Sequence, residues 1–384
     1  MKSHTVLLSA CRLVIFTPMR MLAPFLPAFS RGMGVDLTTI SLAITAAMGA
    51  SAISPFLAPI AERRGRRAGM LTGLLLFLSG VTLLVFWPTI QAFFIAIFLI
   101  YLGDNVYAPA SQAYLGDQIP YAQRATALAV LEMGWSLSFI LAVPLMGLLI
   151  ARFGWHSPFT AIAGAGLLMI LLFLRVIPKD TPKDGVPAPV VSLLSDLKTV
   201  LKHAPARAGL TMGMLILVGN TIFTLVFGVW MENSYGLNIT ALGLAAAVLG
   251  FSELGGEGLA AWLSDRIGKE RSAAIGLAGN LLAAVSLRWL GFSLWGALLC
   301  LALFYISFEF AMVSILPLMS EILPAQRATT MAVYISAASI GVAIGAWLAP
   351  LFYVHGMWAN ALACAALDFM AILILTRVKI ANIG

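Results

Sequence analysis

The chain has 384 residues, of which 61% are hydrophobic and only 10% are charged, and its formal net charge is +7. A soluble domain carries about 25% charged residues, so this composition excludes an ordinary soluble protein. The basic residues lie in short segments between apolar runs and form no patch for nucleic acid. We therefore predict a multi-pass membrane protein whose surroundings are the lipid bilayer and which has no nucleic-acid partner.

Twelve apolar runs, taken in chain order, have the length of a membrane-spanning helix. They cover residues 5–29, 37–60, 69–88, 90–115, 124–151, 157–177, 208–231, 240–263, 272–290, 292–319, 328–353 and 357–376. Pro18, Pro24 and Pro27 interrupt the first run, which predicts an irregular first span. The predicted fold class is therefore an all-α membrane protein with twelve transmembrane helices.

The long connection between the sixth and seventh runs differs from the others. Residues 178–189 are polar and rich in proline, and residues 191–202 place leucines and a valine at helical spacing. This pattern predicts a linker followed by an amphipathic helix on the membrane surface. The expected domains are a six-helix bundle over 1–177, a linker over 178–206 and a second six-helix bundle over 207–384.

The two halves of the chain repeat one another. Arg124 and Arg327 lie in matching Ala-Gln-Arg-Ala-Thr segments, 203 residues apart. Glu62 and Asp265, in two short charged loops, have the same offset, and so does a pair of tryptophans that follow glycine-containing turns. Three markers at one offset indicate two copies of a unit of roughly 200 residues.

The orientation of the helices follows from the placement of lysine and arginine. If both termini lie on one side, that side carries 18 of the 23 basic residues. Arg31, Arg152 and Arg288 lie on the other side, and Arg12 and Arg20 lie within the first span. Cytoplasmic loops carry the excess of basic residues, so we expect a protein of the plasma or inner membrane with both termini in the cytoplasm.

The sequence contains none of the short motifs expected of an enzyme or a metal site. It lacks His-Glu-x-x-His, Gly-x-Ser-x-Gly and a Walker loop for ATP. Cys11, Cys300 and Cys364 have no Cys-x-x-Cys spacing, and the four histidines are not clustered. We therefore expect no enzymatic activity, no cofactor and no bound metal.

Ionisable residues at membrane depth are the most informative feature, because a charge in the bilayer is costly and usually faces a partner or a cavity. The residues proposed for proton coupling are Arg20, Asp104, Glu132, Glu253, Glu257 and Glu309. One hypothesis is that Arg20 neutralises Asp104 or Glu132 and that protonation of the carboxylate releases the pair. The alternative is a permanent ion pair between helices. For Asp368, in the last span, a structural role is favoured.

The charged loops and the duplicated arginines carry a resemblance to a known family. Ala58, Glu62, Arg63, Gly65, Arg66 and Arg67 in the first half, with Asp265, Arg266, Gly268 and Lys269 in the second, match the loop motif of the major facilitator superfamily. The chain resembles this superfamily over its whole length. We expect a cytoplasmic gate formed by Glu62, Arg63, Gly65, Arg66, Arg67, Asp117, Arg124, Asp265, Arg266, Lys269, Glu321 and Arg327. The alternative is ordinary topology with helix capping.

The resemblance implies a central cavity lined by spans 1, 4, 7 and 10 and flanked by spans 2, 5, 8 and 11, with the last span at the periphery. Candidate substrate contacts are Asn105, Tyr107, Trp135, Asn220 and Phe223, each of which is alternatively a packing residue. The acidic and aromatic lining favours cationic or neutral amphipathic substrates.

The function implied is secondary transport of a small molecule by alternating access, similar to bacterial drug or metabolite antiporters. We expect a monomer that exports its substrate in exchange for protons. The alternatives are a proton-coupled importer, a lipid transporter of the same fold, and a receptor or scaffold that does not transport.

Overall fold

The computed structural model describes residues 2–52, 65–179 and 197–378, and these residues form helices and no strand. The helices before the linker are α1 (Lys2–Arg20), α2 (Leu22–Met33), α3 (Leu37–Ala52), α5 (Arg66–Phe86), α6 (Ile90–Gln118), α7 (Tyr121–Glu132), α8 (Gly134–Leu137), the π-helix η1 (Ser138–Ala142), α9 (Val143–Phe153) and α10 (Ser157–Val176). Those after it are α12 (Ala204–Thr224), α13 (Phe227–Tyr235), α14 (Ile239–Ile267), α15 (Lys269–Leu290), α16 (Leu294–Glu321), the 3₁₀-helix η2 (Pro324–Gln326), α17 (Arg327–Tyr353) and α18 (Met357–Leu375).

These helices confirm the predicted all-α membrane fold. Within the described residues, ten helical stretches are long and apolar enough to cross a bilayer, and α1 with α2 forms an eleventh span that is bent by 52°. The shorter apolar helix α3 lies where the second span is predicted. Within the described residues each of these helices overlaps a predicted span, and several of them extend a few residues beyond it.

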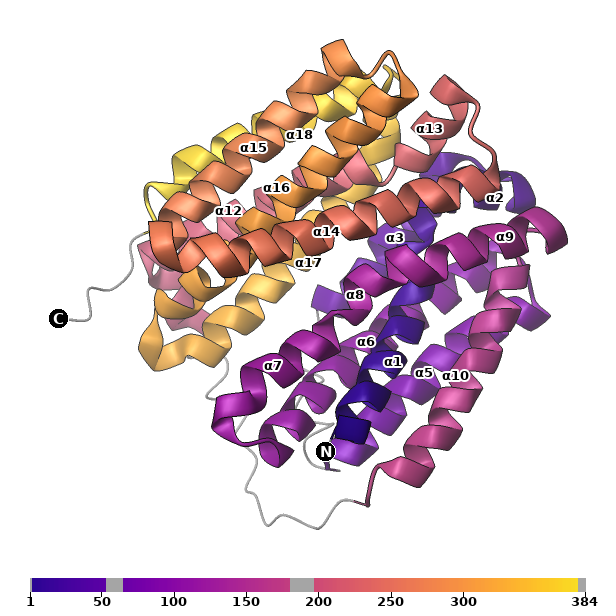
Figure 1. Cartoon of the computed structure of the whole chain (residues 1–384), viewed down its shortest axis with the longest axis horizontal. Coiled ribbons are helices and arrows are strands. Elements are labelled where there is room, and N and C mark those ends of the chain that lie inside the picture. Colours follow the sequence, from indigo (N-terminus) through magenta and orange to yellow (C-terminus); the bar gives the residue numbers. More distant parts are fainter. Residues whose placement is uncertain (1, 53–64, 180–196, 379–384) are drawn as a thin grey trace. The chain divides into compact units, whose positions relative to one another are not determined.

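By packing, the chain divides into two compact units, one made of 1–187 with 231–247 and the other of 188–230 with 248–384. The end of α13 and the beginning of α14 thus pack with the first unit, although they follow the linker in sequence (Figure 1). An ion pair within this unit joins α2 to α13, with Arg31 Nη2 2.9 Å from Glu232 Oε1.

The first unit depends on a close contact between α5 and α6. A Cβ atom placed on Gly73 would lie 2.6 Å from the carbonyl oxygen of Gly103, and one placed on Gly103 would lie 2.7 Å from the carbonyl oxygen of Gly73. The two backbones therefore touch with no side chain between them, as small residues allow in membrane helices. This contact holds α6 at a fixed height beside α5 and so positions the polar residues of α6.

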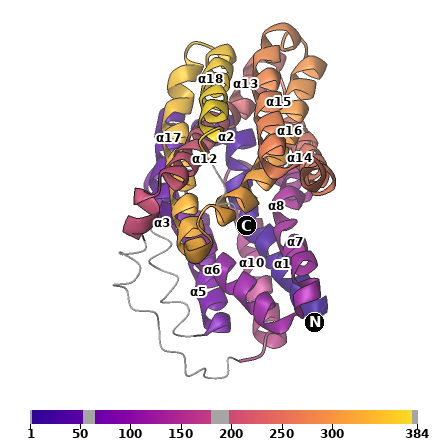
Figure 2. The ribbon, with the colours of Figure 1, turned by 90° about the vertical axis from the view of Figure 1, so that its left-hand side faces the viewer.

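In the second unit, α15 packs along α16, and α12 packs along α17 and α18 (Figure 2). Val200, near the end of the predicted surface helix, is fully buried in the core of this unit with Leu210 and Ile322, whereas Leu201 is exposed. The described end of that helix therefore has one buried and one exposed face, and the buried face packs on the second unit. Residues 191–196 lie outside the described part of the chain.

A buried amide links three helices of the second unit. Asn360 of α18 is fully buried and donates hydrogen bonds of 2.8 Å to the carbonyl oxygen of Ile222 and 2.9 Å to that of Ala349. Asn360→Ala should lower the free energy of unfolding by about 2 kcal/mol, because two buried carbonyl oxygens lose their donor. Thermal denaturation in detergent measures the loss. The exposed Gln91→Ala is the control, and equal melting temperatures for both variants would contradict the expectation.

Candidate functional site

A cluster of three charged side chains lies inside the first unit. Arg12 of α1 places Nη1 2.8 Å from Asp104 Oδ1 of α6 and Nη2 2.7 Å from Glu132 Oε2 at the end of α7. The exposed fraction of the side chain is 6% for Arg12, 17% for Asp104 and 45% for Glu132. One buried guanidinium therefore joins three helices, and it bonds two carboxylates that differ in their exposed fraction.

The residues next to Glu132 allow the α7–α8 segment to approach α1 closely. A Cβ atom on Gly134 would lie 3.0 Å from the backbone nitrogen of Leu13 and 3.2 Å from Cβ of Arg12. The Ser9 hydroxyl donates a 2.9 Å hydrogen bond to the carbonyl oxygen of Val130. The glycine and this hydrogen bond bring the α7–α8 segment against α1, so that Glu132 reaches Arg12.

A neighbouring amide completes the cluster. Gln112 Nε2 donates a 3.0 Å hydrogen bond to Glu132 Oε1, so both carboxylate oxygens of Glu132 accept a hydrogen bond. With both acids ionised, one cation faces two anions. Charge-assisted hydrogen bonds of this length are the strong ones, and addition of a proton to either acid removes one of them.

The partner of the two acids is Arg12, in place of Arg20 as hypothesised from the sequence. Arg20 is eight residues further along α1, which corresponds to about 12 Å along the helix. There, its guanidinium carbon lies 4.1 Å from the ring centroid of Trp135 and 3.4 Å from that of Phe139. The sequence showed both arginines in the first span, and the error lay in assigning the role by depth alone.

Two backbone irregularities meet near Arg20. The first span bends by 52° between α1 and α2, immediately after Arg20, and this confirms the irregular first span predicted from its prolines. The fifth span contains the π-helix Ser138–Ala142, which ends two residues before Pro144. π-Bulges are frequent at functional sites, and no residue pattern in the sequence indicated this one.

The candidate substrate residues of α6 have defined hydrogen bonds. Asn105 Nδ2 donates to the hydroxyl of Ser51 on α3 at 2.7 Å. Tyr107 is fully buried and its hydroxyl donates a 3.2 Å hydrogen bond to the carbonyl oxygen of Leu8 on α1. For Tyr107, this burial favours the packing alternative.

In the second unit, the three glutamates lie around a single helix contact. A Cβ atom on Gly256 of α14 would lie 2.8 Å from Cβ of Glu309 on α16, and Glu253 and Glu257 flank that glycine in the sequence. Glu253 is 1% exposed, whereas Glu257 and Glu309 are half-buried. The structure thus places Glu309 beside the segment of α14 that carries Glu253 and Glu257.

The remaining candidates of this unit differ in burial. Phe223 is fully buried and stacks on Phe304, with ring centroids 4.2 Å apart, which favours packing. Asn220 is half-buried. Asp368 is 1% exposed and accepts a 3.7 Å contact from the Cys364 thiol, and this burial favours the structural alternative.

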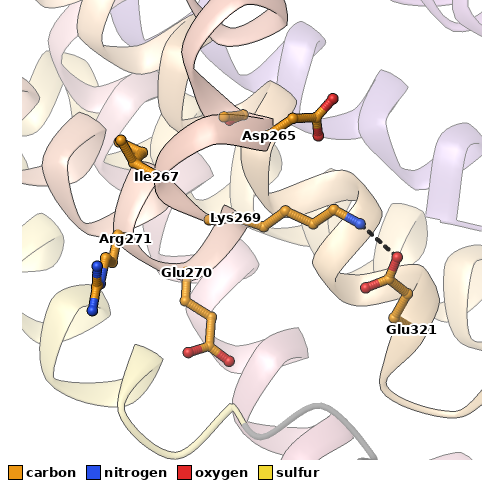
Figure 3. A pocket seen from close by; sticks show the side chains of 8 residues that line it. Asp265, Ile267, Lys269, Glu270, Arg271 and Glu321 are labelled. Carbon is orange, nitrogen blue, oxygen red and sulfur yellow. Dashed lines mark hydrogen bonds and ion pairs between the residues drawn. The ribbon is translucent and has the colours of Figure 1, made fainter. Parts of the chain in front are cut away.

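The predicted gate residues bind mostly to their own neighbours. Lys269 Nζ lies 2.6 Å from Glu321 Oε1, beside a cavity of about 410 Å³ also lined by Asp265 and Glu270, whose side chains extend in other directions (Figure 3). In the first unit, Arg66 Nε lies 3.5 Å from Asp117 Oδ2.

Other members of the predicted gate bind backbone or a ring. Arg124 Nε donates to the carbonyl oxygen of Ile119 at 3.0 Å, and Arg327 Nε donates to that of Ser320 at 3.1 Å. Each of the two repeated arginines thus binds a carbonyl oxygen near the end of the preceding helix. The Arg266 guanidinium lies over the ring of Trp262. Glu62 and Arg63 lie outside the described residues.

Comparison with known proteins identifies the family. The profile described as Major Facilitator Superfamily matches residues 8–346 and 210–381. The chain belongs to this superfamily. The MFS-type transporter YwfA of Bacillus subtilis is 23% identical over 91% of this chain and 85% of its own. The nucleoside transporter NupG has the same fold, with a TM-score of 0.83, 14% identity and coverage of 98% of this chain and 100% of its own.

A shorter match adds one named substrate. The 4-hydroxybenzoate transporter PcaK of Acinetobacter baylyi is 27% identical over 40% of this chain and 34% of its own. The family and its relatives confirm the predicted fold and establish a multi-pass secondary transporter.

Proposed function

We propose that this superfamily member couples transport to protons through Arg12, Asp104 and Glu132. The observation that carries the proposal is the pair of hydrogen-bonded contacts, 2.8 and 2.7 Å, from one guanidinium to two carboxylates. Protonation of either acid removes one charge-assisted hydrogen bond and frees part of the Arg12 fork. Because Arg12 joins α1, α6 and α7, its release loosens three helices at once.

The two acids differ in the exposed fraction of their side chains, as expected if one of them receives the proton first. The Glu132 side chain is 45% exposed, whereas the Asp104 side chain is 17% exposed. A proton that reaches Glu132 neutralises it and leaves the Arg12 guanidinium, which stays charged, bonded to Asp104 alone. The other named function, a permanent ion pair between helices, requires no such access.

The direction of transport depends on the charge of the substrate. Export in exchange for protons, the direction predicted from the sequence, requires a substrate that competes with the proton, as a cation does at a carboxylate. Uptake together with protons is a second candidate. It is supported by the second arginine of the same span, Arg20, and by PcaK, a relative named for an aromatic carboxylate.

The test uses purified protein in liposomes that contain a pH-sensitive dye. Candidate drugs, nucleobases, sugars and organic acids are added in turn, with Asp104→Asn and Glu132→Gln beside the wild type. We expect a substrate-triggered pH change in the wild type that falls at least tenfold in either variant. Substrate movement without any proton movement in the wild type would overturn the proposal.

The sign of the pH change separates the two directions. Protons leaving the lumen as substrate enters indicate antiport, and protons entering with the substrate indicate symport. Exchange of labelled substrate for unlabelled substrate across the membrane requires no net proton movement. We therefore expect both variants to retain this exchange, which also shows that they are folded.

A further inference from the structure

We propose that one end of the second unit, the end predicted to be cytoplasmic, binds the phosphate of an anionic phospholipid. The binding groups are four exposed cations, namely Arg271 at the start of α15, Arg377 just after α18, and Lys198 and Lys202 at the described end of the linker. The ion pairs formed among the described residues include none of the four. A phosphate can therefore reach them without displacing an acid of the described chain.

The buried neighbours of these four cations belong to a single core cluster. Val200, Ala273 and Val378 are all buried in that cluster. Each of them is within two positions of one of the four cations in the sequence. The helix α15 also packs along α18. Segments that are far apart in the sequence thus bring their basic residues to the same end of the second unit.

The exposed face of α15 has the composition of a helix surface that lies against lipid. Arg271, Ile275 and Leu282 are exposed, and their spacings of four and seven residues put them on one side of the helix. Trp289, seven residues further along, is exposed at the other end of this stripe. Tryptophan and the charged ends of arginine side chains lie at the headgroup level of a bilayer, and apolar side chains lie between them. The stripe therefore places Arg271 among lipid headgroups.

The helix α18 shows the same pattern with the opposite chain direction. Leu362, Phe369 and Leu373 are exposed at spacings of seven and four residues. The backbone nitrogen of Arg377 donates a 2.8 Å hydrogen bond to the carbonyl oxygen of Ile374, so the chain continues in a further turn beyond α18. Both helices thus present an exposed apolar stripe that is followed by an arginine at the same end of the unit.

The described end of the linker adds two lysines to this end of the unit. Lys198 and Lys202 are four residues apart, so they lie on one side of their helical segment. Leu201, next to Lys202, is 45% exposed, whereas Val200 is fully buried in the core. An exposed leucine with lysines beside it is typical of a segment at a membrane surface, because the leucine enters the apolar layer and the lysines meet anionic headgroups.

The chemistry of these side chains selects a lipid with a net negative charge. Lys269 bonds Glu321 at 2.6 Å, and Arg271 points away from that pair, so its guanidinium is separate from the predicted gate (Figure 3). A guanidinium can bond two phosphate oxygens at once. A zwitterionic headgroup also contains a phosphate, but its own ammonium group opposes the attraction of nearby cations. Four cations at one end of the unit therefore favour an anionic lipid over a zwitterionic one.

The experiment titrates the purified full-length protein in detergent with short-chain phosphatidylglycerol, or with phosphatidylcholine that has the same acyl chains. Native mass spectrometry measures the bound lipid, and the melting temperature is recorded in parallel. We expect phosphatidylglycerol to bind at least tenfold more tightly. The double variant Arg271→Gln, Arg377→Gln should bind phosphatidylglycerol about 25-fold more weakly, which is about fivefold for each arginine, and should bind phosphatidylcholine as before.

Further variants test the charge and its position. Arg271→Lys keeps the charge, so we expect most of the affinity for phosphatidylglycerol to remain. Lys198→Gln combined with Lys202→Gln should cause a loss similar to that of the arginine pair. Arg288→Gln is the matched control, because this arginine is exposed at the other end of α15, and this variant should bind as the wild type does. All these side chains are exposed, so we expect every variant to fold.

Each outcome has a distinct meaning. Equal binding of the two lipids, or phosphatidylglycerol binding that the double variant retains, overturns the proposal. A loss of equal size in Arg288→Gln also overturns it, because any surface cation would then serve. Inorganic phosphate that competes with the lipid at equal concentration would assign the site to free phosphate and overturn the choice of lipid. A loss confined to the four cations supports the proposal, whether or not protons drive transport.

Discussion

Arg12→Gln should abolish proton-driven transport and strongly destabilise the first unit. The change leaves Asp104 and Glu132 close together without the cation that bonds both at 2.8 and 2.7 Å. Removal of one partner from a buried ion pair costs about 3–5 kcal/mol. We expect the lower end, about 3 kcal/mol, because water screens the partly exposed Glu132. Thermal denaturation and the liposome assay measure the two effects.

Neutralising the acids should reverse the stability loss but not the loss of coupling. In the triple variant Arg12→Gln, Asp104→Asn, Glu132→Gln, no buried charge is left unbalanced, so we expect most of the melting temperature to return. Proton movement should remain absent, because no group of the cluster titrates. An Arg12→Gln protein that still drives substrate with protons would show that coupling resides elsewhere. Arg175→Gln, exposed at the end of α10, is the matched control.

Gly103→Leu should separate α5 from α6 and prevent stable folding of the first unit. A Cβ atom at this position would lie 2.7 Å from the carbonyl oxygen of Gly73 and 2.8 Å from the backbone nitrogen of Phe77. Backbone atoms of a packed helix do not move aside as a flexible side chain does. Overpacking costs about 1–3 kcal/mol and occasionally more, and we expect the upper end here because Asp104 is displaced as well.

The expected result is measured as the fraction of monodisperse protein after detergent extraction and as the melting temperature of that fraction. Gly164→Leu in α10 is the control, because nothing lies within 4 Å of the Cβ position there. Gly103→Ala should show a smaller loss than Gly103→Leu. A Gly103→Leu protein as stable as the Gly164→Leu control would show that α5 and α6 separate without cost.

The predicted gate shows which contacts the pattern of residues could indicate. The sequence placed Lys269 and Glu321 in the predicted gate, and Lys269 Nζ lies 2.6 Å from Glu321 Oε1 within the same half of the chain. The repeated arginines, which are also predicted gate residues, each donate a hydrogen bond to a backbone carbonyl oxygen near the end of the preceding helix. Such local features follow from spacing along the chain, because their partners lie within one loop or between adjacent helices.

The all-α class, the duplication and the expected bend in the first span were readable in the residues. Apolar length and proline position act locally and need no knowledge of the fold. The partner of Asp104 was not readable, because Arg12 and Arg20 are both arginines in the first span and differ by about two helical turns. The position of α1 along α6 and α7 decides which arginine reaches Asp104. This position depends on the close contact between Gly134 and α1.

The surroundings of the acids and aromatic rings could not be read from the sequence, for the same reason. Composition showed acids and aromatic rings at membrane depth. Packing showed that Arg12 bonds Asp104 and that Arg20 lies over the ring of Trp135. A residue list counts chemical groups, but only the folded chain shows which of them contact one another, because helix contacts form between residues more than a hundred positions apart.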